Sequence, residues 1–224
     1  MLFMKKTVVA IIVCLLLSCV FFLNPGQVKA SSSFGVKPGD WIEYKVSTTG
    51  TPALGHDLIW ARMEVVNISG TKMWVNIVAE TPNGSLSSAI RDIDFTIGDV
   101  EAWIIIPANL NPGASFYDVL TNSTITIQGQ KTKTIAGATR TITYVDTPQR
   151  HKEWDKATGV YIQTSDYLPG YKVNATAFAT NMWAPQILGF DQTMFYVTII
   201  VIAIVIVVAL IIVFVRRKAS KRMA

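Results

Sequence analysis

The hydrophobic and polar positions of this chain divide it into two long apolar runs with a patterned segment between them. The second run, residues 195–215, contains no charged side chain, and Tyr196 lies near its beginning. At ~1.5 Å per residue, a helix of this length spans about 30 Å, the hydrocarbon thickness of a bilayer. The basic residues that follow, among them Arg216 and Arg217, are typical of a cytoplasmic flank. We therefore predict a single-pass transmembrane helix over 195–215, a cytoplasmic basic tail over 216–224, and an external location for the preceding domain.

The first apolar run, residues 7–23, follows two lysines and ends in a helix-breaking Asn-Pro-Gly sequence. Val28 and Ala30 are small or short, and they stand at the −3 and −1 positions that a signal peptidase recognises if it cleaves after Ala30. This pattern predicts a secretory signal peptide over 1–30. Two alternatives stay open. The run is long enough to remain as an uncleaved anchor, and the residues up to Cys19 loosely resemble a lipoprotein processing box.

Between the two runs, apolar and polar side chains alternate with a period of two, which is typical of β-strands. Residues 73–79 alternate in this way, and the Thr-Pro-Asn-Gly sequence after them is a strong hairpin turn. Residues 102–106 are apolar on both faces, which predicts a central strand. We expect strands at 41–46, 58–68, 73–79, 88–97, 102–106, 124–128, 133–145, 150–154, 160–165 and 172–181.

This succession of strands and short turns predicts an antiparallel meander, because strands joined by short connections pair with each other. A meander of this length must curl or split into two sheets. We therefore expect a mainly β domain over 31–181 that forms a curved sheet or incomplete barrel, with a β-sandwich as the alternative. Residues 182–194 would then form a juxtamembrane linker between this domain and the transmembrane helix.

One arginine is predicted to lie inside the sheet. Along the expected strand 133–145, Arg140 shares a face with small and aliphatic side chains, which is the side expected in the core. A buried arginine needs a partner. If the next hairpin pairs Tyr144 with Arg150, Trp154 lies opposite Arg140. We therefore predict a structural cation–π pair between Arg140 and Trp154.

The net charge of +5 is a property of the two ends of the chain. Residues 31–191 carry 12 basic and 15 acidic side chains, which leaves a net charge of −3. A nucleic-acid-binding domain would concentrate basic residues on its folded surface, so we predict no nucleic-acid partner. The predicted partners are the lipid bilayer and, at the basic tail, anionic lipid.

The chain offers little for catalysis. Both cysteines precede residue 30, so the external domain has no cysteine for a disulfide, a nucleophile or a metal site. His56 and His151 stand in no catalytic or metal-ligating pattern. Asp92 and Asp94 share a strand face, and paired carboxylates can hydrolyse a glycosidic bond, although a solvated strand face explains them more simply. We predict no enzymatic activity, no metal and no cofactor.

If the β domain lies outside the membrane, two further sets of surface residues can be predicted. Aromatic and basic side chains near the membrane are expected at its interfaces. Asn-x-Ser/Thr sequences in an external domain are candidate N-glycosylation sites. The interface residues are Trp183, Phe190, Tyr196, Arg216 and Arg217, and the candidate glycosylation sites are Asn67, Asn83, Asn122 and Asn174.

Four stretches together resemble a family of uncharacterised archaeal surface proteins with a signal peptide, one β domain and a carboxy-terminal membrane helix. They are residues 35–44, 104–110, 137–140 and 151–159. The resemblance covers nearly all of 35–190, implies no activity or catalytic residue, and favours an archaeal source, in which N-glycosylation of surface proteins is common. The Trp-Asp-Lys-x-Thr-Gly hairpin at 154–159 is also similar to hairpins in curved-sheet lipoprotein carriers of the LolA type.

These observations predict a membrane-anchored surface protein whose non-catalytic β domain serves recognition or envelope structure, with an envelope protein as partner. The alternative is a carrier that binds a lipid or another hydrophobic ligand on the concave face of its sheet, where tryptophan rings could line a cavity. A carboxylate-dependent hydrolase is the third hypothesis. A deep apolar cavity would favour the carrier, and a filled core would favour the recognition module.

Overall fold

The β domain and the carboxy-terminal helix are both seen in a computed structural model. It describes residues 34–53, 55–95, 101, 103–119, 121–148, 150–187 and 189–221, with side chains up to residue 214. The predicted signal peptide and the side chains of Arg216 and Arg217 lie outside this described part. The elements are β1 (Trp41–Gly50), β2 (Trp60–Ser69), β3 (Lys72–Glu80), β4 (Leu86–Asp94), β5 (Ser115–Asp118), β6 (Ser123–Thr126), β7 (Gly129–Ile135), β8 (Ala138–Thr147), β9 (Arg150–Asp155), β10 (Tyr161–Leu168), β11 (Tyr171–Thr180), β12 (Gln186–Ile187), β13 (Phe190–Asp191) and α2 (Gln192–Lys221).

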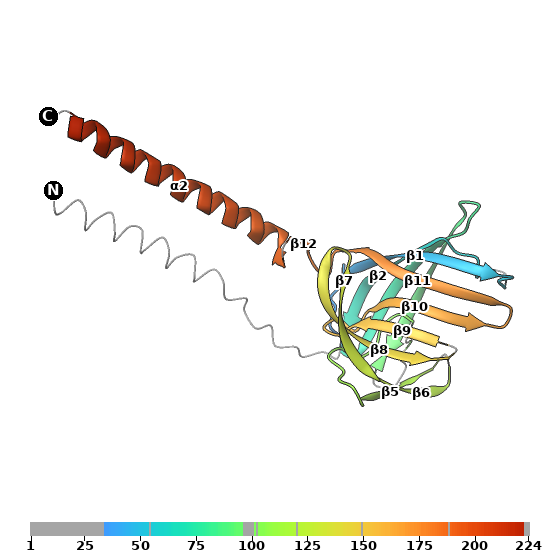
Figure 1. Ribbon diagram of the computed structural model, residues 1–224. Coiled ribbons are helices and arrows are strands. Elements are labelled where there is room, and N and C mark those ends of the chain that lie inside the picture. The colour runs from blue at the N-terminus through green and yellow to red at the C-terminus, as the bar shows by residue number, and fades with distance from the viewer. Residues whose placement is uncertain are drawn as a thin grey trace. The chain divides into compact units, whose positions relative to one another are not determined.

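Nine of these strands form one antiparallel sheet in the order β4-β3-β2-β1-β11-β10-β9-β8-β7. The strands curve around a common interior (Figure 1). The sheet is unclosed, with β4 and β7 at its ends. Two local meanders, β1 to β4 and β7 to β11, are joined because β1 pairs with β11. The prediction of a mainly β, curved antiparallel sheet is confirmed, and the chain does not form the alternative sandwich of two stacked sheets.

The core lies on the concave side of this sheet. Inward-facing side chains such as Ile42, Val65, Met73 and Ile93 are almost completely buried. Segments outside the sheet fill part of the interior, most of all residues 103–106, which we call the plug, and the β5–β6 hairpin. The curved sheet therefore encloses a core that is built partly from non-strand residues.

The plug corrects the expectation of a central strand at 102–106. Ile104 and Ile105 both donate their backbone N–H groups to the Glu101 carbonyl, so the chain turns here instead of extending. One isolated bridge joins Ile105 to Val160. The continuous apolar pattern arises because Ile104 and its neighbours are surrounded by core on all sides, a situation that sequence periodicity does not distinguish from a central strand.

The expected single strand 133–145 is also wrong. Ala136 and Gly137 have φ angles of 47° and 79°, and they form a two-residue turn between β7 and β8. Positive φ at both central positions is the requirement of a type I′ hairpin turn, whose twist matches that of the flanking strands. The polar run 129–135 is therefore a separate edge strand.

The hairpin between β8 and β9 changes the partner of Arg140, because Thr147 pairs with Arg150. Tyr144 lies opposite Glu153 and not Arg150, so the residue opposite Trp154 is Thr143. The Arg140 guanidinium instead donates to the buried Asp155 carboxylate over 2.7 and 3.0 Å. It also lies 4.8 Å from the centre of the Trp183 ring. The prediction of a pair with Trp154 is wrong because the β8–β9 turn lies further along the chain than the expected pairing of Tyr144 with Arg150 requires.

Trp183 is likewise not a membrane-interface residue. Its side chain is 8% exposed, and its indole N–H donates to the Ile135 carbonyl over 3.1 Å. The ring belongs to the core of the domain, although it follows the last strand of the sheet. Phe190, by contrast, is 62% exposed, and its contact with lipid stays a prediction, as does that of Tyr196.

Residues 185–187 are fixed to the β7–β8 turn. The Gln186 N–H donates to the Gly137 carbonyl over 2.7 Å, and the Gln186 side-chain oxygen accepts from the Thr139 N–H over 3.0 Å. The Asp191 carboxylate accepts from the backbone N–H groups of Thr193 and Met194. This is the capping geometry of a helix amino terminus, and it explains why α2 begins before the expected residue 195.

We expect Arg140→Ala to lower the free energy of unfolding by about 2–4 kcal/mol, because it leaves the Asp155 carboxylate buried without its cation. Denaturant unfolding of the full-length chain, followed by tryptophan fluorescence, measures the change. Arg62→Ala is the matched control. Its guanidinium also stacks on a tryptophan ring, at 4.5 Å from Trp41, but its carboxylate partners are partly exposed. The control should lose less than about 1 kcal/mol, and equal losses in the two variants would contradict the interpretation.

Candidate functional site

The concave side of the sheet contains two neighbouring cavities. One is polar, has a volume of about 450 Å³, and lies between β8, β9 and the β5–β6 hairpin. The other is mainly apolar, has a volume of about 210 Å³, and lies over β1, β2, β10 and β11 beside the plug. Both are framed by strands of the same sheet, so the curvature of that sheet creates them.

Three cross-strand pairs between β9 and β10 separate the two cavities. Trp154 pairs with Tyr161, Lys152 pairs with Thr164, and Arg150 pairs with Asp166. In each pair the β9 residue lines the polar cavity and the β10 residue lines the apolar cavity. Paired strands lie about 4.8 Å apart, so the two cavities are immediate neighbours.

The apolar cavity is walled by aromatic and aliphatic side chains. Tyr44 donates its hydroxyl hydrogen to the Tyr161 carbonyl over 2.9 Å, and the two rings lie 5.7 Å apart. Burial raises the pKa of both hydroxyls above their usual range. The tyrosines therefore present neutral, dry ring surfaces. Ala61 and Ala175 also line the cavity, and their small side chains leave its volume open.

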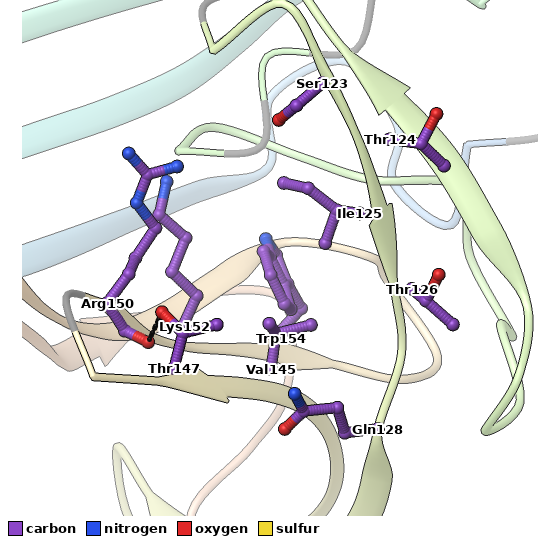
Figure 2. Close-up of a pocket in the computed structure, with 10 residues that line it drawn as sticks. All are labelled: Ser123, Thr124, Ile125, Thr126, Gln128, Val145, Thr147, Arg150, Lys152 and Trp154. Atoms are coloured by element: carbon purple, nitrogen blue, oxygen red, sulfur yellow. Dashed lines mark hydrogen bonds between the residues drawn. The ribbon is translucent and has the colours of Figure 1, made fainter.

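The polar cavity combines two cations with an apolar wall. Figure 2 shows the side chains of Arg150 and Lys152 extending in the same direction from β9, beside the Trp154 ring. Trp154 is completely buried and contacts Phe116 edge-to-face at 6.0 Å. Ile125 of the β5–β6 hairpin faces the same space (Figure 2).

Lys152 has an unusual environment for a lysine. Its residue is 6% exposed. Within the described part of the chain, the ammonium makes no hydrogen bond and no ion pair, although Asp118 and Asp166 are close enough to act on its charge. Burial lowers the pKa of Lys152, Asp166 and Asp118 raise it in part, and the nearby Arg150 lowers it further. Removal from water is the largest of these effects and leaves the pKa below its usual range.

The opposite face of β9 carries a different kind of charge cluster. The Glu153 carboxylate is 1% exposed and is held by Lys131 at 2.5 Å, Lys133 at 2.7 Å and His151 at 2.9 Å. Burial raises the pKa of Glu153, but the hydrogen bonds from these three side chains outweigh burial and leave the pKa below its usual range. The two lysines balance the charge of Glu153 and His151 makes a further hydrogen bond to it, so this cluster supports the β7–β9 edge and leaves the carboxylate occupied.

The other predicted site residues are not brought together. The His56 ring shares a hydrogen bond of 2.6 Å with the Tyr171 hydroxyl. His151 lies on another strand, opposite Ser165, so the two histidines do not form one site. Asp94 pairs with the exposed Lys72 at 3.4 Å, and Asp92 is exposed on β4. Neither aspartate lines the two cavities described above.

The candidate glycosylation sites lie in different settings. Asn67, Asn83 and Asn122 are exposed, and Asn83 lies in the β3–β4 turn, where its side chain accepts from the Ser85 N–H. Asn174 is half-buried, and its side-chain oxygen accepts from Ser165. Modification at all four stays a prediction.

Sequence reasoning did not select Arg150 and Lys152. A signal was present, because residues 150–155 alternate Arg, Lys and Trp on one face with His, Glu and Asp on the other. A strand with charges on both faces and a tryptophan among them is unusual for a half-buried sheet. Only the register with β10 shows which of these faces is turned toward the interior.

Comparisons with known proteins add little to this geometry. No protein-family model matches the chain, and no curated protein matches its sequence. Among solved structures, the chain is similar to the siderocalin Ex-FABP, described as functioning through dual ligand specificities. That match covers 65% of this chain and 74% of the other, at 8% identity and a TM-score of 0.26. A likeness this distant transfers no ligand and no site, and the resemblance to archaeal surface proteins stays a prediction.

We expect Lys152→Met to stabilise the domain by about 1 kcal/mol at pH 7, because it removes a buried charge whose protonated form is disfavoured by folding. Since the pKa of Lys152 is lowered in the folded chain, the unfolded chain binds more protons than the folded chain at pH values between this lowered pKa and about 10. The stability of the unmodified protein should therefore rise with pH toward 10, and this rise should be smaller in the variant. Denaturant unfolding at pH 7 and pH 9.5 measures both effects.

Lys45→Met is the control for this prediction, because Lys45 is exposed on the convex face of β1. It should change neither the stability nor its pH dependence by more than about 0.5 kcal/mol. A marked loss of stability in Lys152→Met would show instead that Asp118 and Asp166 gain more from the ammonium than its burial costs.

Proposed function

We propose that this protein is a membrane-anchored binding protein that holds a small hydrophobic molecule on the concave face of its curved sheet. The apolar cavity of about 210 Å³ beside Tyr44 and Tyr161 carries the proposal. Mostly apolar walls with a few polar groups at the border are the lining that small-molecule sites share, and the modest volume suits a slender ligand. A completely filled core would have favoured a recognition or envelope-structure role instead.

The anchor is the second part of the proposal. Helix α2 includes one apolar segment, Gln192–Phe214, that is long enough to cross a membrane. The most apolar part of this segment has no buried residue, so its side chains are available for contact with lipid. The basic residues after 215 favour a cytoplasmic carboxy terminus and a β domain on the outer side.

The short connection between sheet and helix supports a role close to the membrane. Residues 185–187 are hydrogen-bonded to the β7–β8 turn, and α2 begins at Gln192. Few residues remain to act as a flexible tether. A site held near a bilayer suits a ligand that partitions between water and lipid.

We expect Ala175→Phe to abolish most hydrophobic ligand binding, because Ala175 lines the apolar cavity and a phenyl ring would occupy it. The measurement is the fluorescence of the neutral probe N-phenyl-1-naphthylamine with the full-length chain in nanodiscs, after subtraction of empty nanodiscs. Thr176→Phe is the matched control, since Thr176 is exposed on the opposite face of the same strand. The control should bind as the unmodified chain does, with at least about tenfold higher affinity than Ala175→Phe. Equal signals in all three proteins would overturn ligand binding and favour the recognition role.

We expect protease added to intact cells to remove the β domain and to spare a tag fused after Ala224, because the basic tail should remain in the cytoplasm. Alkaline carbonate washing should leave the full chain in the membrane fraction and release a chain that ends before Gln192. Loss of the tag from intact cells would contradict the orientation, and release of the full chain by carbonate would contradict the anchor.

A further inference from the structure

The polar cavity is a candidate binding site for an anion. Arg150 and Lys152 both line it, and no carboxylate is found among its lining residues within the described part of the chain. The remaining lining consists of hydroxyl, amide and apolar side chains. Arginine and lysine are the side chains that bind carboxylate and phosphate groups most strongly, through charge-assisted hydrogen bonds.

Lys152 is the member of this pair that most needs a partner. It is more than nine-tenths buried, and its ammonium has no hydrogen bond or ion pair to any described residue. A buried charge without a partner destabilises a fold. The nearest acids, Asp166 and Asp118, act on its charge without a hydrogen bond to it, and their shorter contacts are made elsewhere. Asp166 lies 3.6 Å from the Arg150 Nε and lines the apolar cavity, and Asp118 accepts a hydrogen bond from Thr121 over 2.6 Å.

The neighbouring cavity indicates what kind of molecule would carry the anion. Lys152 and Arg150 stand directly across the β9–β10 pairing from Thr164 and Asp166, which line the apolar cavity. Thr164 and Asp166 are polar and stand at the border of that cavity, and its nearest aromatic wall is Tyr161, which pairs with Trp154. A charged group bound by the two cations would therefore lie within about one to two residue positions of an aromatic surface along these strands. Trp154 adds a further apolar wall beside the cations (Figure 2).

We propose that Arg150 and Lys152 bind the anionic head group of a single-chain amphiphile, whose apolar part occupies the cavity beside Tyr44 and Tyr161. This inference rests on the proposed hydrophobic ligand binding and names the chemical class of the ligand. A carboxylate and a phosphate monoester share the chemistry that the two cations recognise. The head group and the apolar chain each use a different cavity, so their contributions can be measured separately.

The test uses the full-length chain in nanodiscs and isothermal titration calorimetry, with empty nanodiscs subtracted. The probes are decanoate, decyl phosphate, the neutral decanol, and inorganic phosphate alone. We expect the two anionic amphiphiles to bind at least about tenfold more tightly than decanol. Arg150→Gln and Lys152→Met should each weaken decanoate and decyl phosphate by about tenfold or more and leave decanol unchanged. Lys45→Met, which removes an exposed lysine on the opposite face of the sheet, should change no affinity.

The remaining outcomes separate this inference from the proposed function. If decanol binds as tightly as decanoate and neither cation variant alters binding, the head-group inference fails and hydrophobic ligand binding stands. If none of the amphiphiles binds, both fail. If inorganic phosphate binds as tightly as decyl phosphate, the cavity is a site for free anions and the amphiphile is excluded. Thermal unfolding of each variant shows that it is folded before the titration is interpreted.

Discussion

The pairing of β1 with β11 is the constraint on which the rest of the structure depends. It brings Ile42 opposite Thr180 and joins two local meanders into one sheet. The core draws on side chains from both meanders, so neither of them alone encloses it. The joined sheet of nine strands twists and curls, and its concave side gathers the core. Because these strands are distant in the sequence, their pairing lowers the conformational entropy of the chain between them, and burial of the core offsets this cost.

The interior of this sheet is filled unevenly, and the unfilled parts define the function we propose. The plug fills one region with Ile104 and its neighbours, and the β5–β6 hairpin fills another with Phe116. Gly159 permits the close approach of the plug, because a Cβ at this position would lie 2.0 Å from the Ile106 carbonyl oxygen. The volumes that remain adjoin the β9–β10 pairs. A curved sheet that its own side chains do not fill completely leaves open volumes on its concave side, and these are the binding face that we propose.

Three buried charges differ in how they are compensated, and this difference separates structural roles from the ligand-binding role that we propose. Glu153 is held by two lysines and a histidine, and Asp155 by Arg140 together with the backbone and hydroxyl of Thr158. For both carboxylates, the opposite charges and the hydrogen bonds offset the free-energy cost of removing the carboxylate from water. Lys152 lies on the neighbouring position of the same strand but on the other face, where a cavity replaces a partner. A buried cation beside a cavity, with carboxylates nearby but no hydrogen-bond partner, is the arrangement on which our anion proposal rests.

The sequence by itself determined the membrane-length helix, the mainly β character, the antiparallel connectivity and the curvature, because length, alternation and short turns are local properties. It also placed Arg150, Lys152 and Trp154 on one face of a strand. It did not reveal the hairpin at Ala136–Gly137, whose alanine gives no sign of a positive φ. It also did not fix the β8–β9 register, so the partner of Arg140 was misassigned. It could not distinguish a buried plug from a central strand. Tertiary structure decided these points, because register depends on pairings between residues far apart in the chain, and those pairings determine which side chain faces a cavity.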